Sequence, residues 1–260
     1  MSTSEAQFES ADAIAFLTFN RPAARNALTW AMYDALVQAC DRVDDDDTVR
    51  VFVVRANGDA FAAGTDISQF KGFASGADGI AYERRLDAVI DRLERVSKPT
   101  IAQVHGVAAG GGCAIALTCD LRVCTPKAQF GVPIARTLGN CLSAANLARL
   151  VDLVGPARTK ELLFTGRLLD AAEAASLGLV TRLAEPGEID TVVRDLAQSI
   201  AANAPLTIRA TKEVVRRIAL RRRLDTPEAD DLIAACYASH DFREGVAAFL
   251  EKRRPRFTGR

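Results

Sequence analysis

The sequence predicts an α/β fold whose last part is entirely helical. Up to about residue 185, short apolar runs typical of buried strands alternate with runs that have the spacing of amphipathic helices. Beyond that point, only helical spacing is visible. With 260 residues, 49% of them hydrophobic, the chain is long enough to bury a full core. We expect a core at residues 1–188 and a helical region at residues 189–260 that packs on the core or on another subunit.

The first expected elements are a strand, a helix and a second strand. Residues 13–20 alternate in polarity as a strand does. Thr29 has the character of a helix N-cap, and the apolar residues after it recur at helical spacing until an acidic run begins at Asp44. Residues 49–55 are a short β-branched run typical of a buried strand. The loop that follows, residues 58–66, leaves the end of a strand, where functional sites often lie.

The next segments repeat this order. Residues 80–96 have a helical pattern, and residues 100–104 have the pattern of a short buried strand. Three consecutive glycines, Gly110 to Gly112, then open a short apolar helix, and residues 121–124 return to strand. This alternation is typical of a chain wound in similar structural turns rather than of a doubly wound sheet. Further helices are expected at residues 189–202, 205–220, 227–238 and 241–253.

Charge and cysteine usage exclude several classes of protein. The 33 basic and 33 acidic residues cancel, so no overall field attracts nucleic acid or an anionic membrane. No leader peptide and no apolar run of about 20 residues is visible, and we expect a cytoplasmic protein without membrane partners. The six cysteines form no C-x-x-C pair and have no histidines nearby, so we expect free thiols and no metal site.

The glycine run fits none of three common motifs. It lacks the spacing G-x-G-x-x-G of dinucleotide sites, the Lys-Ser/Thr pair of phosphate loops, and the G-x-S-x-G of hydrolases. Glycines that open a helix can instead aim backbone N–H groups at an oxyanion, or they can simply form a close-packed turn without a ligand. A second loop with small residues, 61–66, also follows a buried strand. Two donor loops are what an oxyanion hole requires.

A series of motifs from about residue 13 to 257 resembles the enoyl-CoA hydratase/isomerase (crotonase) superfamily. In chain order they lie at residues 20–22, 26–28, 60–66, 106–112, 119–120, 130–133, 165–166, 171–180, 242–245 and 256–257. The resemblance implies a crotonase-like spiral of β-β-α turns and a C-terminal helical region that forms trimers, which often pair into hexamers. It also implies an acyl-CoA substrate of fatty acid metabolism and no cofactor besides the coenzyme A that the substrate carries.

The resemblance also assigns site residues. The backbone N–H groups of Thr65 and Gly111 would hold the thioester oxygen and stabilise an enolate. Arg25, Lys71 and Lys252 would supply positive charge for coenzyme A, although a solvated chain end is the other interpretation of Lys252. The full set of residues expected at the coenzyme is Ala23, Ala24, Arg25, Ala63, Asp66, Ile67, Lys71, Phe249, Lys252 and Phe257.

The chain departs from the family at the two positions that carry proton transfer. The resemblance implies that hydratases of this family use two carboxylates. One of the two groups accepts a proton while the other delivers one. Here Ala114 stands at the first position, and Ile134 or Ala135 stands at the second. None of these side chains can take a proton. We therefore expect either a lyase or isomerase with another acid/base group, or a catalytically silent acyl-CoA-binding protein.

Three residues are candidates for the missing chemistry. Cys141 lies where the similar segment of 4-chlorobenzoyl-CoA dehalogenases has a nucleophilic aspartate, and it is either a nucleophile or apolar filler. His105, at a strand end, is either a base or an ordinary hydrogen-bonded histidine. Arg136 is either a clamp for a carboxylate on the acyl group or an exposed arginine.

Overall fold

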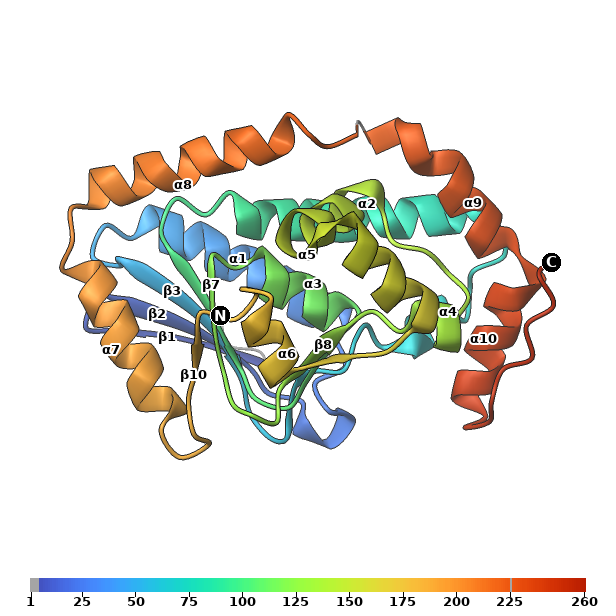
Figure 1. Ribbon diagram of the computed structural model, residues 1–260, viewed down its shortest axis with the longest axis horizontal. Coiled ribbons are helices and arrows are strands. Elements are labelled where there is room, and N and C mark those ends of the chain that lie inside the picture. Colours follow the sequence, from blue (N-terminus) through green and yellow to red (C-terminus); the bar gives the residue numbers. More distant parts are fainter. Residues whose placement is uncertain (1–4, 225) are drawn as a thin grey trace.

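The structure contains two sheets that the chain visits in turn (Figure 1). The computed structural model describes residues 5–224 and 226–260. The strands are β1 (Ala6–Ala11), β2 (Ile14–Phe19), β3 (Val51–Ala56), β4 (Ala60–Ala62), β5 (Thr100–Val104), β6 (Val107–Ala109), β7 (Leu121–Cys124), β8 (Gln129–Gly131), β9 (Leu169–Asp170) and β10 (Arg182–Leu183). The larger sheet has the order β1-β2-β3-β5-β7-β10, and the smaller has the order β4-β6-β8-β9.

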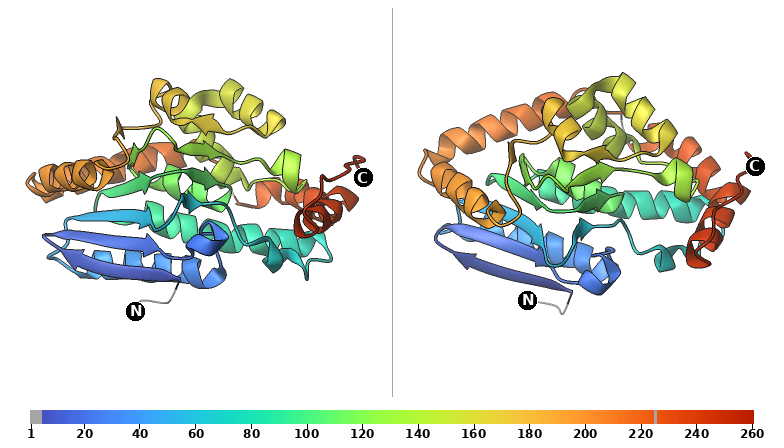
Figure 2. Two further views of the ribbon diagram at one scale, coloured as in Figure 1. Left: turned by 90° about the horizontal axis from the view of Figure 1, so that it is seen from below. Right: turned by 60° about the horizontal axis from the view of Figure 1, so that its bottom comes forward.

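Helices surround these sheets. They are α1 (Trp30–Asp45), α2 (Gly76–Glu94), α3 (Gly111–Thr118), α4 (Ile134–Thr137), α5 (Ala144–Thr165), α6 (Ala171–Ser176), α7 (Ile189–Ala201), α8 (Pro205–Leu220), α9 (Asp230–Ala238) and α10 (His240–Leu250). Short 3₁₀ turns lie at Pro22–Ala24, Ile67–Phe70 and Thr226–Ala229. In the described part of the chain, only helices and loops follow β10, and Figure 2 shows them flanking the sheets.

Three successive turns of the chain have the same plan. Each contributes a strand to the larger sheet, then a short strand to the smaller sheet, then a helix: β3-β4-α2, β5-β6-α3 and β7-β8-α4. Strands from neighbouring turns pair in parallel in both sheets. The expected α/β fold, wound as a spiral of β-β-α turns, is therefore confirmed.

The larger sheet is buried on both faces. Successive side chains of a strand point to opposite faces, so a run buried on every residue, such as Val51–Val54, needs cover on both sides. On one face, Phe52 and Val54 join the main core with α1, α2 and α3. On the other face, Val51 and Val53 pack against α7 through Val193 and its neighbours. This second cluster explains why the strand pattern at residues 49–55 is continuous rather than alternating.

The C-terminal helices pack unequally. Helix α9 lies against α2, and α10 contacts α9 (Figure 1). Helix α8 passes along one side of the molecule, and none of its 16 residues is buried. Leu206, Val214, Val215 and Ile218 of this helix are all more than half exposed. The boundary at residue 188 between a core and a helical region remains a prediction.

Candidate active site

Two glycine turns leave the same edge of the smaller sheet. Strands β4 and β6 run in parallel, and each is followed within two residues by a glycine in the left-handed region, Gly64 with φ 116° and Gly110 with φ 50°. Residues with a Cβ rarely adopt this backbone conformation. A Cβ built on Gly110 would lie 3.5 Å from the Cα of Gly64, so the two turns touch. The sequence-predicted donor loops are therefore adjacent in space.

The N–H group of Thr65 is turned outward by a short backbone bridge. Leu28 N donates to Gly64 O at 2.7 Å, and Asp66 N donates to Leu28 O at 2.9 Å. In a parallel bridge of this kind, the two hydrogen bonds to Leu28 are made by Gly64 and Asp66. Thr65, which lies between them, points its own N–H away from Leu28. Within residues 5–224 and 226–260, no hydrogen bond uses Thr65 N–H. The bridge thus leaves one backbone donor free.

Gly111 supplies the second free donor because it is the first residue of α3. The first N–H groups of a helix have no intrahelical acceptor, and the helix dipole adds partial positive charge there. Gly110 N donates to Gly131 O at 3.0 Å, which holds the turn against β8. In the described residues, Gly111 N–H has no acceptor. Two unbonded donors thus meet where the two turns touch.

A cluster of three buried hydroxyls lies behind these donors. The Thr65 Oγ1 atom is 2.8 Å from the hydroxyl of Tyr33 and 2.8 Å from that of Tyr82. A Cβ built on Gly111 would lie 2.1 Å from the Tyr33 hydroxyl. Burial raises the pKa of both tyrosines above its ordinary value, so the cluster is neutral. The hydroxyls hold the Thr65 side chain inside the protein while its N–H faces out.

Several residues expected at coenzyme A gather beside the Thr65 turn. Ala23 and Ala24 lie in a 3₁₀ turn capped by Arg25, and Ala63 N donates to Arg25 O at 3.0 Å. Asp66 accepts a hydrogen bond from Arg21 at 2.7 Å. Burial alone would raise the pKa of Asp66, but its hydrogen bonds to Ser68 and Arg21 lower it below the ordinary value. Ile67 begins the next 3₁₀ turn, and Lys71 caps its end with an exposed side chain.

The C-terminal residues expected at coenzyme A lie on another element. Phe249 and Phe257 line a hollow of about 700 Å³ together with Arg136 of α4. Lys252 is exposed, follows α10 and has a φ of 55°. The structure therefore brings Arg136 beside two of the aromatic side chains that the resemblance placed at the coenzyme.

The two positions expected to carry carboxylates are apolar. Ala114 faces a cavity of about 20 Å³ whose other walls are Leu117, Val132, Leu142, Asn146, Arg149 and Leu150. Ile134 begins α4 and is partly buried against the main core. The cavity walls hold no carboxylate that could exchange a proton.

A buried carboxylate that sequence reasoning missed lies on α2. Glu83 is 2% exposed, and its carboxylate accepts from the Tyr237 hydroxyl at 2.5 Å and from Ser143 N at 3.2 Å. Burial raises the pKa of Glu83 to about 7. Asn140 Nδ2 donates to the same Tyr237 hydroxyl at 3.0 Å. A signal existed, because Glu83 falls on the apolar face of the helical pattern with Leu86 three residues later.

Cys141 and His105 have other partners. Cys141 is half-buried, and its Sγ lies 3.9 Å from Leu232 O. A hydrogen bond with Cys236, followed by burial, raises the pKa of Cys141, which disfavours its thiolate. His105 Nε2 is 2.7 Å from Gly58 O, at a hollow that it shares with Lys127 and Asp190.

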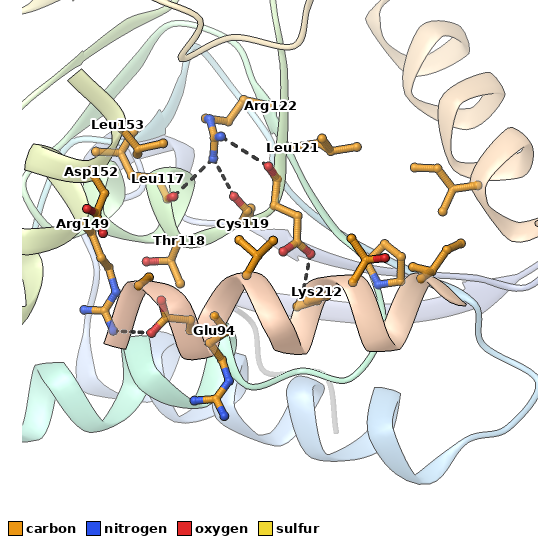
Figure 3. Close-up of a pocket in the computed structure, with 18 of the residues that line it drawn as sticks. Glu94, Leu117, Thr118, Cys119, Leu121, Arg122, Arg149, Asp152, Leu153 and Lys212 are labelled. Carbon is orange, nitrogen blue, oxygen red and sulfur yellow. Dashed lines mark hydrogen bonds and ion pairs between the residues drawn. The ribbon is translucent and has the colours of Figure 1, made fainter. Parts of the chain in front are cut away.

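Another cavity, of about 580 Å³, lies between the far end of α3 and α8 (Figure 3). At this end the buried guanidinium of Arg122 donates to the carbonyls of Leu117 and Cys119, and Lys212 of α8 donates to Asp120 at 2.7 Å. The cavity is thus separated from the glycine turns by the length of α3.

No group of three His, Cys, Asp or Glu residues suited to a metal ion occurs in the described part of the chain. Among the described helices, none combines the length and apolarity needed to cross a membrane.

Comparisons with known proteins identify the family. Residues 9–260 match the enoyl-CoA hydratase/isomerase family. The short-chain-enoyl-CoA hydratase of Clostridium acetobutylicum is 33% identical, with 93% of this chain and 92% of that protein covered. An enoyl-CoA hydratase/carnithine racemase from Magnetospirillum magneticum superposes with a TM-score of 0.80 at 34% identity, covering 100% of this chain and 97% of the other. A methylmalonyl-CoA decarboxylase complexed with 2S-carboxypropyl CoA superposes with a TM-score of 0.91 at 28% identity, covering 100% of both chains. The chain belongs to the enoyl-CoA hydratase/isomerase (crotonase) superfamily.

Proposed function

We propose that this acyl-CoA enzyme binds the carbonyl oxygen of a thioester between the N–H groups of Thr65 and Gly111. The observation that carries the proposal is the meeting of two unbonded backbone donors, one of them at a helix N-terminus. Donors fixed in this way stabilise negative charge that develops on the oxygen of an enolate or a tetrahedral intermediate. The enzyme would belong to the lyase or isomerase class and need no cofactor besides the coenzyme A of its substrate.

In this proposal the coenzyme lies along the residues beside the Thr65 turn. Arg25, Ala63 and Asp66 are joined to the Thr65 turn by backbone contacts and by the Arg21 ion pair. Lys71 and Lys252 are exposed and free to approach phosphates. In this proposal Phe249 and Phe257 contact the coenzyme from the C-terminal side.

The lack of a carboxylate around Ala114 favours reactions in which no side chain removes a proton from the thioester. Loss of carbon dioxide from a 2-carboxyacyl-CoA is one such reaction. The electrons of the breaking C–C bond form the enolate, carbon dioxide leaves, and a proton from water completes the product. The overlap with methylmalonyl-CoA decarboxylase supports this candidate, and the absence of a carboxylate from the cavity walls fits it. Enoyl-CoA hydration would need an acid/base group other than Ala114 and Ile134.

A silent acyl-CoA-binding protein is the second candidate. The observation that favours it is the replacement of both expected carboxylates by Ala114 and Ile134. Both candidates require that the two donors bind the thioester, and they differ only in turnover.

We also propose a cytoplasmic homotrimer or dimer of trimers. The support is α8, whose apolar side chains are exposed and which borders the 580 Å³ cavity. Burial of such a surface is a common basis of subunit association. Light scattering after size-exclusion chromatography would measure the assembly, and a stable monomer at micromolar concentration would contradict this part of the proposal.

A panel of thioesters tests the function. Crotonyl-CoA, 3-hydroxybutyryl-CoA, methylmalonyl-CoA and a haloaryl-CoA are assayed for turnover, and binding is measured by calorimetry. Turnover of any member supports the enzyme, whereas binding without turnover supports the silent protein. Failure to bind any acyl-CoA contradicts both. Crotonyl-CoA hydration at about 1 to 1000 per second would show that the missing carboxylates are not required.

A further inference from the structure

The six cysteines fall into two groups. Cys40, Cys113, Cys119 and Cys124 are buried in the core. Cys141 and Cys236 are half-buried. Cys141 lies between α4 and α5, and Cys236 lies on α9 in the C-terminal helices. Although they are far apart in the sequence, the Cys141 thiol lies on the turn of α9 that carries Cys236, with its Sγ 3.9 Å from Leu232 O.

The contact is part of a double connection between a loop and a helix. The Cys141 Sγ lies 3.9 Å from Leu232 O, one helical turn before Cys236, so the thiol sits over that turn of α9. The neighbouring residue, Asn140, donates to the hydroxyl of Tyr237 at 3.0 Å. The consecutive loop residues Asn140 and Cys141 thus pack on the turn of α9 that carries Cys236 and Tyr237. Tyr237 is in turn fixed by its 2.5 Å hydrogen bond to Glu83 of α2.

The two groups of cysteines differ in reactivity. Burial raises the pKa of each core thiol to about 12, so these four are protonated at neutral pH. The hydrogen bond from Cys141 lowers the pKa of Cys236 to about 7 and raises the pKa of Cys141. Two thiols that share a hydrogen bond titrate as one unit, and the first proton leaves more easily than from a single thiol. Because the thiolate is the nucleophile, the half-buried pair is the reactive one.

We propose that Cys141 and Cys236 form a redox site that accepts two-electron oxidants of the peroxide class and closes a disulfide. In the first step the Cys236 thiolate attacks one peroxide oxygen and the O–O bond breaks, so that Cys236 becomes a sulfenic acid and the other oxygen leaves as hydroxide. This hydroxide takes up the proton that the Cys236 thiol released and becomes water. In the second step the Cys141 sulfur attacks the sulfenic sulfur, and the hydroxyl group leaves as water with the thiol proton. Two thiols are oxidised and one hydrogen peroxide is reduced to two waters.

The disulfide would join the C-terminal helices to the spiral covalently. Its closure links the loop after α4 to α9, and α10 with Phe249 follows α9 directly. A cross-link between distant parts of a chain raises thermal stability mainly by restricting the unfolded chain. The redox site does not depend on which thioester reaction the protein catalyses.

The test begins with the fully reduced protein, treated with one equivalent of hydrogen peroxide at pH 7.5. Peptide mapping without reduction is expected to yield one cross-linked species, Cys141–Cys236, with the four core cysteines still free. The melting temperature of the oxidised protein should rise above that of the reduced protein and return after dithiothreitol. A folded protein that forms no Cys141–Cys236 peptide, or that is oxidised first at core cysteines, would overturn the proposal.

Two serine variants separate the roles of the thiols. In Cys141→Ser, Cys236 should stop at the sulfenic acid and be trapped by dimedone, whereas in Cys236→Ser the remaining Cys141 should react slowly. The pH at which alkylation of Cys236 is half-maximal should move from about 7 in the wild type towards about 8.5 in Cys141→Ser. Equal alkylation rates at Cys236 with and without Cys141 would contradict the hydrogen-bonded pair. Both single variants retain the four core cysteines Cys40, Cys113, Cys119 and Cys124, so the unchanged labelling of these four serves as the internal control for folding.

Discussion

Two regions that meet at α3 differ in the kind of chemistry they can perform. The start of the helix and the Thr65 turn present backbone donors that depend on glycine geometry. One turn further along, Ala114 faces a small cavity with no carboxylate in its walls. The first region offers the donors for the proposed polarisation of a carbonyl group, and the cavity walls of the second offer no carboxylate for proton transfer. The difference teaches that, in the proposed function, polarisation would depend on the main chain and proton transfer on side chains, so that one could be kept while the other is lost.

The largest expected effect comes from removing one backbone donor. Gly111→Pro deletes the N–H at the first helical position, where proline is otherwise well tolerated. Because a Cβ at this position would lie 2.1 Å from the Tyr33 hydroxyl, both test variants carry Tyr33→Phe. We expect Gly111→Pro with Tyr33→Phe to lose about 10²–10³-fold in kcat relative to Gly111→Ala with Tyr33→Phe.

This comparison is measured on whichever thioester of the panel is turned over, or as the affinity for acyl-CoA if none is. Circular dichroism and thermal melting establish that both double variants are folded. Equal activity and equal affinity in the two folded variants would remove Gly111 N–H from the site.

The second effect concerns Glu83, the buried carboxylate of α2 that bonds Tyr237 and Ser143. Burial raises its pKa from 4.5 to about 7, so the folded protein holds this proton more tightly than the unfolded chain. The corresponding stability is fully present below pH 4.5 and is lost as the pH rises through 7. The loss amounts to about 3 kcal/mol at most. In Glu83→Gln this part of the pH dependence should disappear.

Urea unfolding of the wild type and of Glu83→Gln between pH 4.5 and 8 measures the difference. Glu94 on the same helix provides the contrast: burial would raise its pKa, but Arg223 and Arg149 lower it to about 2. Its contribution is therefore constant over this pH range and is lost only under strong acid. A difference between wild type and Glu83→Gln that does not vary with pH would contradict the assignment.

A smaller effect is expected for Thr65→Val, which keeps the backbone donor and removes the hydroxyl. Two hydrogen bonds, to Tyr33 and Tyr82, are lost. At about 1 kcal/mol each, the free energy of unfolding should fall by about 2 kcal/mol. The loss in kcat should be well below that of the Gly111 variant. Thr65→Ser retains the hydroxyl and serves as the matched control in the same unfolding and kinetic measurements.

Equal stability of Thr65→Val and Thr65→Ser would show that the hydroxyl cluster does not hold the turn. A larger kinetic defect in Thr65→Val than in the Gly111→Pro variant would mean that side chains, not the main chain, perform the polarisation.

The smallest effect is expected for Ala114→Ser. The cavity of about 20 Å³ has room for roughly one water-sized group, so the hydroxyl fits without displacing its neighbours. Stability should change by less than about 1 kcal/mol, and turnover of the best thioester should stay within about twofold. Ala114→Cys is the control of similar size. A rise in crotonyl-CoA hydration in Ala114→Ser alone would show that one hydroxyl restores the missing proton transfer.

The sequence predicted the longer elements well. Thr29 caps α1 as expected, with its Oγ1 accepting from Met32 N at 3.2 Å. The runs at 49–55 and 100–104 correspond to β3 and β5. The three-residue strands β4, β6 and β8 were missed, because three residues are too few to show a periodicity.

For the candidate site, the sequence pointed only to the two backbone turns, and the roles of Thr65 and Gly111 remain a prediction. Gly64 and Gly110 indicated where the two donor turns lie. A backbone that enters the left-handed region directly after a buried strand favours glycine. Tyr33 and Tyr82 gave no sign of a role, because they reach Thr65 from two helices that only the tertiary fold brings together. The contact between Cys141 and Cys236 was hidden for the same reason.

The position of Arg122 has an electrostatic consequence for the opposite end of α3. Its buried guanidinium donates to the carbonyls of Ala116, Leu117 and Cys119, which form the negative end of this short helix. A fixed cation there neutralises the charge that would otherwise weaken the field at the first turn. In the eight residues of α3, the two ends are only about 12 Å apart. Arg122 therefore contributes to the electrostatic potential at Gly111 N–H from the opposite end of the helix.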